Sequence, residues 1–124
     1  MKQLTRAEEQ LMQVLWKLEK AYVRDILDQL PKPKPAYNTV STIVRILEKK
    51  GFIGYKAFGK AHEYYPLVSK KAYRKKHFKG FVSNYFGNSY MALTSFFTKD
   101  EDLSLQELEE IKALIEKEIE QKKK

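Results

Sequence analysis

The sequence predicts a mainly α-helical protein with one small β-hairpin, and three observations lead to this prediction. Apolar residues recur at helical spacing over most of the 124 residues. Two capping boxes, Thr5-Arg6-Ala7-Glu8 and Ser104-Leu105-Gln106-Glu107, mark helix starts near both ends of the sequence. Between them, two aromatic-rich runs flank Gly59-Lys60, which is typical of two strands joined by a tight turn.

The composition is that of a basic protein without cysteine. A formal net charge of +8 and a pI near 9.5 favour an anionic partner, with nucleic acid as the first candidate and a membrane surface as its rival. The lack of cysteine excludes disulfides, thiolate catalysis and metal sites built on sulfur. Because His62 and His77 stand apart from other ligand types, we expect surface roles for them, no metal site and no cofactor.

Several classes of function find no support in the sequence. No apolar run approaches the roughly 20 residues that would cross a bilayer, and Met1-Lys2-Gln3-Leu4 leads into a helix rather than a signal peptide. We therefore expect a cytoplasmic protein with no membrane insertion. The sequence also contains no supported Ser/His/Asp set and no glycine-rich phosphate loop, so we expect no enzyme activity.

Two amphipathic helices are predicted in the first 30 residues. The capping box at Thr5 begins the first helix, which continues to about Glu19. A shorter helix follows over residues 22–30, and prolines at 31, 33 and 35 end it because proline supplies no amide hydrogen. The residues expected to face the core are Leu11, Met12, Leu15, Trp16, Leu18, Val23, Ile26, Leu27 and Leu30.

A third helix is predicted over residues 36–50, and it has two distinct faces. One face is apolar and consists of Val40, Ile43, Val44 and Leu47. The opposite face has no acidic residue and consists of Asn38, Ser41, Thr42, Arg45 and Lys49. These residue types reach base edges and phosphates in a major groove, although the helix alone leaves an ordinary solvated surface equally open. Gly51 is expected to end the helix in a left-handed conformation.

The residues after Gly51 predict a hairpin, with strands over 52–58 and 61–67. Three helices followed by a hairpin is the order of a winged helix-turn-helix, in which the third helix enters the major groove. We then expect base-edge contacts from Asn38, Ser41, Thr42 and Arg45. Contacts to phosphate, from the third helix or the wing, are expected from Lys32, Lys34, Tyr37, Lys49, Lys56 and Lys60.

The character of the sequence changes after residue 68, so we expect a winged-helix domain over 1–68 and a helical domain over 69–124. The helical domain opens with a basic cluster between Lys70 and Lys79. This cluster is either a solvated helix face or a phosphate contact, and the sequence leaves both open. The apolar run from Tyr90 to Phe97 predicts a helix buried on more than one side.

A last helix is predicted from Ser104, where Leu103 can pack on Leu108 as a hydrophobic staple. Little sequence remains to cover the apolar residues of this region, so we expect a second copy of the chain to cover them. The residues expected at this dimer interface are Phe81, Tyr85, Met91, Leu93, Phe96, Phe97, Leu103, Leu108, Ile111, Leu114 and Ile115.

The order and spacing of these motifs resemble the penicillinase-repressor family, which includes the β-lactamase and methicillin-resistance repressors and the related copper-responsive repressors. The resemblance covers nearly the whole chain. It rests on Leu4-Thr5-x-x-Glu8 with Met12, Leu15 and Trp16, on Thr39-Val40 through Leu47-x-x-Lys50-Gly51-Phe52-Ile53, on Tyr64-Tyr65-Pro66-Leu67, and on Phe96 with Asp102-Leu103-Ser104-x-x-Glu107-Leu108.

The resemblance implies a bacterial transcriptional repressor that binds a palindromic operator as a homodimer. It places the recognition helix on residues 36–50, with Asn38, Ser41, Thr42 and Arg45 toward the groove. The family often has longer basic side chains at the positions of Asn38 and Ser41, which indicates a different operator here. The alternative is a winged-helix module that binds protein and reads no DNA sequence.

The resemblance also bears on regulation. Copper-responsive members use a cysteine-rich metal site, and a chain without cysteine excludes sensing by that chemistry. The antibiotic-responsive members are inactivated when the protease of a membrane sensor cuts an Asn-Phe bond in the dimerisation domain. The matching bond here is Ser95-Phe96, so its position is kept and the preceding residue differs. Cleavage at this bond by a partner protease is therefore a hypothesis.

Overall fold

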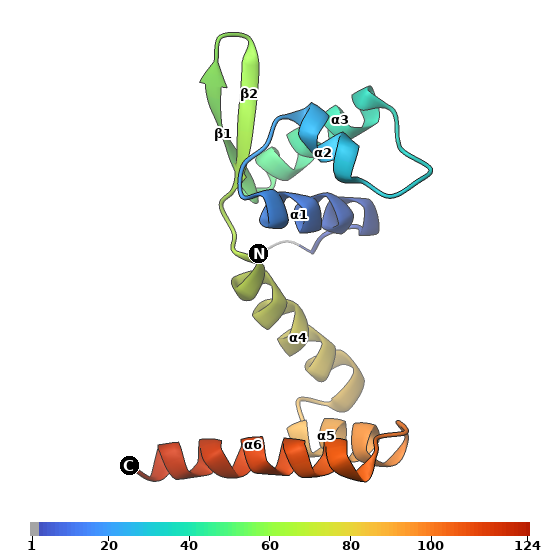
Figure 1. Ribbon diagram of the computed structural model, residues 1–124, viewed down its shortest axis with the longest axis vertical. Coiled ribbons are helices and arrows are strands. Elements are labelled where there is room, and N and C mark those ends of the chain that lie inside the picture. The colour runs from blue at the N-terminus through green and yellow to red at the C-terminus, as the bar shows by residue number, and fades with distance from the viewer. Residues whose placement is uncertain (1–2) are drawn as a thin grey trace. The chain divides into compact units, whose positions relative to one another are not determined.

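The computed structural model describes residues 3–124, and over this range it contains six helices and a two-stranded antiparallel sheet (Figure 1). The predicted fold class, mainly helical with a winged helix-turn-helix, is confirmed. The elements are α1 (Arg6–Leu18), α2 (Val23–Gln29), α3 (Tyr37–Lys49), β1 (Ile53–Phe58), β2 (Ala61–Pro66), α4 (Lys70–Phe86), α5 (Tyr90–Lys99) and α6 (Leu105–Lys123).

The chain forms two compact units, and the division between them falls inside α4. The N-terminal unit extends to His77, and the C-terminal unit consists of Phe78–Lys124. We expected the boundary at the start of α4, between residues 68 and 69. The first two turns of α4 belong to the N-terminal unit because Tyr73 is buried there, with its ring 5.8 Å from those of Trp16 and Phe52.

The core of the N-terminal unit lies between α1, α2, α3 and the base of the hairpin (Figure 1). The helices form because their apolar residues recur at helical spacing and meet on this core. Trp16 is only half-buried, and its indole Nε1 donates to the Val68 carbonyl at a distance of 2.8 Å. The fully buried large side chains of this unit are Leu11, Met12, Leu15, Ile26, Val40, Val44, Leu47, Phe52 and Ile53.

The predicted helix boundaries agree closely with the structure. The Thr5 hydroxyl accepts from the Glu8 amide at 3.2 Å, and a Glu8 carboxylate oxygen accepts from the Thr5 amide at 3.0 Å, which completes the predicted capping box. At the other end of the helical region, Gly51 has φ of 85° and follows the C-cap residue Lys50 of α3. A side chain is strained in that left-handed conformation, so glycine suits the position.

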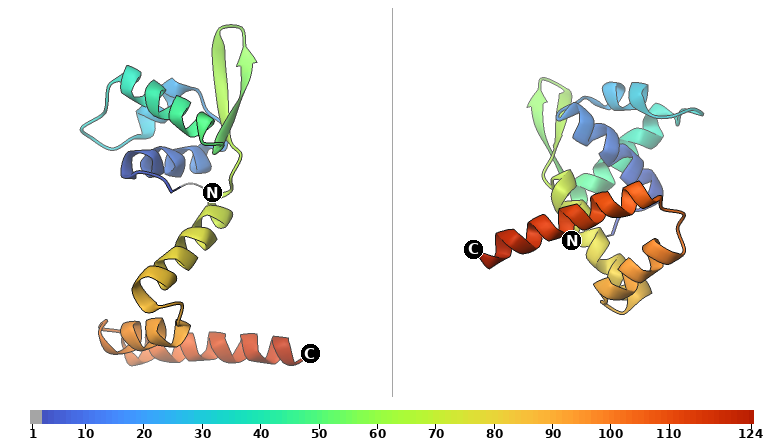
Figure 2. Two further views of the ribbon diagram at one scale, coloured as in Figure 1. Left: turned by 180° about the vertical axis from the view of Figure 1, so that it is seen from behind. Right: turned by 60° about the horizontal axis from the view of Figure 1, so that its bottom comes forward.

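The wing is a regular hairpin that projects beyond the helices of the N-terminal unit, as the views in Figures 1 and 2 show. Its register pairs Ile53 with Pro66 and Phe58 with Ala61, and the turn between the strands is the predicted Gly59-Lys60. Two backbone hydrogen bonds join Ala21 and Tyr64 in both directions, at 2.9 and 2.8 Å. These bonds fix the base of β2 to the segment between α1 and α2.

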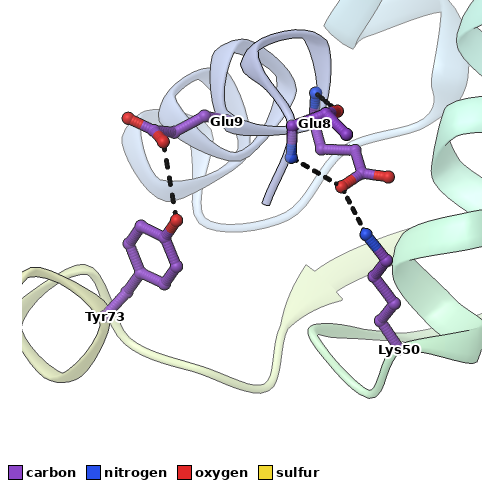
Figure 3. A network of polar contacts seen from close by, with 5 residues as sticks. Glu8, Glu9, Lys50 and Tyr73 are labelled. Carbon is purple, nitrogen blue, oxygen red and sulfur yellow. Dashed lines mark hydrogen bonds and ion pairs between the residues drawn. The ribbon is translucent and has the colours of Figure 1, made fainter. Parts of the chain in front are cut away.

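An ion pair joins the start of α1 to the end of α3 (Figure 3). The Lys50 ammonium lies 2.7 Å from a carboxylate oxygen of Glu8, which is only 5% exposed. Burial alone would raise the pKa of Glu8, but the hydrogen bonds from Lys50 and the Thr5 amide outweigh it and lower the pKa below its ordinary value. In the same network, the Tyr73 hydroxyl donates to Glu9 at 3.5 Å.

The C-terminal unit buries little of its apolar surface within one chain. Its helix α5 forms where the sequence predicted a helix, with Ser89 as N-cap, but contains no buried residue. The expectation that this helix is buried on more than one side is therefore wrong for the single chain, because the short unit has no further element to cover it. The capping box of Ser104 with Glu107 is confirmed, and Leu103 and Leu108 are half-buried.

Two further findings concern the part of the chain that the structure describes. None of its helices is long and apolar enough to cross a membrane. Within residues 3–124, no three His, Asp or Glu side chains gather in a way that could hold a metal ion.

Candidate nucleic-acid interface

The polar face of α3 lies on the outside of the N-terminal unit. Asn38, Thr42, Arg45 and Lys49 are exposed, and Ser41 is half-buried. They stand opposite the buried Val40, Val44 and Leu47, so burial of the apolar face determines which residues point outward. Within residues 3–124, neither Arg45 nor Lys49 forms an ion pair with a carboxylate.

Two hydrogen bonds organise this face. The Thr42 hydroxyl donates to the Asn38 carbonyl one turn earlier, at 2.9 Å. The Arg45 guanidinium donates to the Ser41 hydroxyl at a longer distance of 3.5 Å. Residues four apart are neighbours on a helix surface, so these side chains form one continuous patch. We call Asn38, Ser41, Thr42, Arg45 and Lys49 the α3 polar face.

The N-terminus of α3 is open. Its N-cap residue is Ala36, which provides no side-chain acceptor, and its first turn contains no acidic residue. By contrast, Thr5 and Ser104 cap α1 and α6 through their hydroxyls. The first amides of α3 therefore remain free of any side-chain cap, and such amides attract anions together with the helix dipole.

Arg24 lies beside this open end, and the sequence did not reveal it. Its guanidinium carbon is 5.5 Å from the centre of the Tyr37 ring, a cation–π geometry. Tyr37 is 45% exposed at the first position of α3. Arg24 belongs to α2 and Tyr37 to α3, and no local pattern pairs residues that far apart in a sequence. Arg24 and Tyr37 together place a positive charge at the entry to α3.

Lys34, for which the sequence suggested a phosphate contact, bonds the C-terminal end of α2 in the structure. Its ammonium donates to the carbonyls of Leu27, Asp28 and Leu30, at 3.1, 2.8 and 3.2 Å. These carbonyls lie at the C-terminus of α2, and the Leu27 carbonyl also accepts from the Leu30 amide at 3.2 Å. Since an ammonium has three hydrogens, Lys34 is fully used as a cap. Lys32 is exposed and remains available at the same loop.

The two faces of the wing differ. On one face, the rings of Tyr55 and His62 stack at 4.1 Å with an interplanar angle of 10°, and Tyr64 packs beside them. Burial, with Glu48 nearby, raises the pKa of Tyr64, so its phenol stays neutral at ordinary pH. The other face includes Lys56, while Lys60 lies in the turn, and both lysines are exposed.

The cations of the basic cluster at the start of α4 are exposed, and Glu9 of α1 lies at hydrogen-bond distance from Tyr73 in the middle of the cluster. The sequence contains no Asp or Glu between Tyr64 and Lys99. In the described part of the chain, no cation of the cluster forms an ion pair. Lys70, Lys71, Arg74, Lys75 and Lys76 belong to the N-terminal unit, and Lys79 belongs to the C-terminal unit.

A three-helix unit with a wing and an exposed, carboxylate-free face on its third helix defines the class of winged-helix regulatory proteins. Residues 4–117 match the family described as penicillinase repressor, and the chain belongs to this family. The chain is therefore a transcriptional repressor and not an enzyme.

Two relatives that align with nearly the whole chain support this assignment. The methicillin resistance regulatory protein MecI of Staphylococcus aureus strain N315 is 29% identical over 116 residues, which cover 93% of this chain and 94% of the relative. The penicillinase repressor of Bacillus licheniformis is 23% identical over 122 residues, which cover 98% and 95%. A solved structure described as the CopR repressor covers 55% of this chain and 100% of its own, with 30% identity and a TM-score of 0.46.

Proposed function

We propose that this protein represses transcription in the cytoplasm by binding a palindromic operator as a homodimer, with residues 36–50 in the major groove. The observation that carries the proposal is the α3 polar face, which is exposed, continuous and without a carboxylate partner in the described residues. A face that served only solubility would more often pair acidic with basic residues. A protein-binding face would more often expose aromatic or aliphatic anchors.

Within the α3 polar face, each side chain suits a particular contact. The Arg45 guanidinium can donate two hydrogen bonds to a guanine, and the Asn38 amide can both donate to and accept from an adenine. Ser41 and Thr42 suit a phosphate, or a thymine methyl in the case of Thr42. The side chains that would make these contacts lie on the outward-facing side of α3.

Contacts to the phosphate backbone would surround this face. The open N-terminus of α3, with Arg24 and Tyr37 beside it, suits one phosphate. The lysines proposed for further phosphate contacts are Lys32, Lys49, Lys56 and Lys60, all of them exposed. Such contacts give affinity that does not depend on sequence and that falls steeply with salt.

The proposed dimer rests on the apolar surface of the C-terminal unit. Tyr85 is 74% exposed, Met91 78% and Leu114 60% within one chain. Exposed apolar surface on this scale is unfavourable in water, and a second copy would cover it. A dimer with two-fold symmetry would place one α3 helix at each half of a palindrome. The two half-sites would lie about 34 Å apart along the duplex.

One selection experiment tests the proposal. Fragments of the source genome are bound by the full-length protein, sequenced, and then footprinted with purified protein. The proposal expects a short palindromic site whose two halves are protected equally and are one helical turn or a multiple apart. Binding that stays equal for every sequence, with capture of one protein partner through the α3 polar face, would instead indicate a protein-binding module.

Relief of repression by proteolysis is a second part of the proposal. The Ser95-Phe96 bond lies inside α5, where the Ser95 carbonyl accepts from Thr98 at 3.3 Å and the Phe96 carbonyl accepts from the Asp100 amide at 2.8 Å. The α5 helix must therefore open locally before a protease can bind the bond. If the protease of a membrane sensor cuts here, induced cells should yield a fragment of the protein whose N-terminus is Phe96, identified by N-terminal sequencing. Normal induction without such a fragment would exclude this site.

A further inference from the structure

We infer that Phe58, at the end of the wing, is an apolar probe for the minor groove beside the DNA segment that α3 reads. The inference deepens the proposed function and depends on it. Phe58 is the last residue of β1, directly before the Gly59-Lys60 turn, so it lies at the far end of the projecting hairpin (Figure 2). Its side chain is 48% exposed.

Phe58 differs from the other aromatic residues of the wing, which are covered by or packed on neighbours. Tyr55, His62 and Tyr64 form a stack along one face of the hairpin. Tyr65 lies on the same face of the hairpin as Phe58 but at its base. There it covers Gly54 so closely that a Cβ atom added to this glycine would lie 3.0 Å from the Tyr65 hydroxyl. In the part of the chain that the structure describes, Phe58 has no such ring partner.

Lys56 lies beside the Phe58 ring rather than paired with an acid. It faces Glu63 directly across the hairpin, an arrangement in which opposite charges usually pair. Within residues 3–124, these two form no ion pair, and the Lys56 ammonium instead lies 5.5 Å from the centre of the Phe58 ring. Lys60 adds a second exposed ammonium in the turn. The end of the wing thus combines one aromatic ring with two cations and no paired acid.

An aromatic ring flanked by two lysines suits the minor groove of DNA. The minor groove has a strong negative potential where it is narrow, and it attracts inserted basic side chains. Proteins that enter it often place an apolar side chain against or between base pairs, where it partly unstacks one step. Phe58 would supply the ring, while Lys56 and Lys60 would lie near the flanking phosphates. Flexible pyrimidine–purine steps would be favoured because they unstack most easily.

The base of the wing is rigid enough to present the ring in a fixed direction. The paired hydrogen bonds between Ala21 and Tyr64 hold β2, and the Leu67 amide donates to the Phe52 carbonyl at 2.8 Å. Ile53 is buried at the start of β1. Movement of the tip is therefore limited to the outer part of the hairpin, and substitution of the exposed Phe58 should leave the fold intact.

The test uses the full-length protein and the operator obtained by genomic selection, with 2-aminopurine placed in turn at each adenine flanking the half-site. Wild-type protein should raise the fluorescence at one step in each half, because unstacking relieves quenching of this base. Phe58→Ala should remove that rise and weaken binding on the order of tenfold. Phe58→Trp should keep both, and Lys60→Ala should keep the rise while reducing the salt dependence by about one phosphate contact.

The outcomes separate this inference from the proposed function. If the wild-type protein binds an operator but Phe58→Ala binds equally well, or no flanking adenine responds, the inference is overturned and the repressor remains. If the wild-type protein binds no operator, both fail. Thermal unfolding of Phe58→Ala with an unchanged midpoint would establish that a weaker affinity comes from the lost contact.

Discussion

At the scale of single residues, the Glu8–Lys50 ion pair has a defined effect on stability. Because folding lowers the pKa of Glu8 below its ordinary value of 4.5, the ionised carboxylate stabilises the fold at neutral pH. This contribution is fully present above the unfolded pKa and is lost as the pH falls through the lower, folded pKa. The pair also joins the start of α1 to the end of α3. Its loss would therefore weaken the attachment of α3, the helix that carries the α3 polar face.

Replacing Glu8 with Gln should lower the free energy of unfolding by about 1 to 3 kcal/mol at pH 7, since a charged hydrogen bond with a nearly buried partner is lost. As the pH falls below the lowered, folded pKa of Glu8, the variant and the wild type should converge. Urea unfolding at several pH values measures both. Glu120→Gln is the control, because its partner Lys123 and Glu120 itself are each 70% exposed, and little change is expected. A constant deficit at every pH would contradict the assigned charge state.

Lys32 and Lys34 should differ although both lie in the proline-rich loop before α3. Lys34→Met should lower stability by about 1 kcal/mol, because three carbonyls at the end of α2 lose their hydrogen bonds to the Lys34 ammonium. Lys32→Met should leave stability unchanged and reduce the slope of operator affinity against salt by about 1. Thermal unfolding and salt titrations of both variants distinguish the two roles. If Lys32→Met lowered stability and Lys34→Met reduced the salt dependence, the two roles would be reversed.

At the scale of elements, the open N-terminus of α3 is expected to be used in binding. Ala36→Asp would supply the missing cap and raise stability by about 1 kcal/mol, but its carboxylate would occupy the amides proposed for a phosphate. Operator affinity should therefore fall while stability rises. Ala36→Ser supplies a neutral cap and should lose less affinity. Equal operator affinity for Ala36→Asp and the wild type would remove this helix end from the interface.

The elements themselves were largely predictable because their signals are local. The capping boxes at Thr5 and Ser104, the left-handed Gly51 and the turn at Gly59 each depend on residues within a few positions of one another. The apolar face of α3 followed from helical spacing. Which side of α3 faces outward was thereby predictable as well, since burial of one side exposes the other.

The interactions between elements could not be predicted in the same way. The cation–π contact of Arg24 with Tyr37 and the ion pair of Glu8 with Lys50 join separate helices, so no local pattern marks them. Lys34 was assigned to phosphate because its charge was visible in the sequence, whereas the loop path that turns it back onto α2 was not. The prediction that α5 is buried was wrong for the single chain, because an apolar pattern does not show which chain covers it.

At the scale of the whole molecule, dimerisation should decide operator affinity. Leu114→Asp places a carboxylate within the exposed apolar residues of α6, and it should give a monomer in sedimentation at micromolar concentration. Loss of coupling between two half-sites should cost roughly 100-fold or more in affinity. Ala113→Asp adds the same charge at an exposed position of α6 away from this apolar stripe, and it should remain dimeric. A monomeric wild-type protein that binds tightly would contradict the two-unit account.

The most direct test of the central claim, that α3 reads the operator, is an affinity profile over every single base-pair change in the selected site. Wild-type protein and Arg45→Ala are measured side by side. If α3 reads the operator, Arg45→Ala should lose about 1 to 3 kcal/mol of discrimination at one symmetric pair of positions and keep the rest of the profile. A profile that is unchanged, or weakened equally at every position, would show that Arg45 reads no base and would contradict the account.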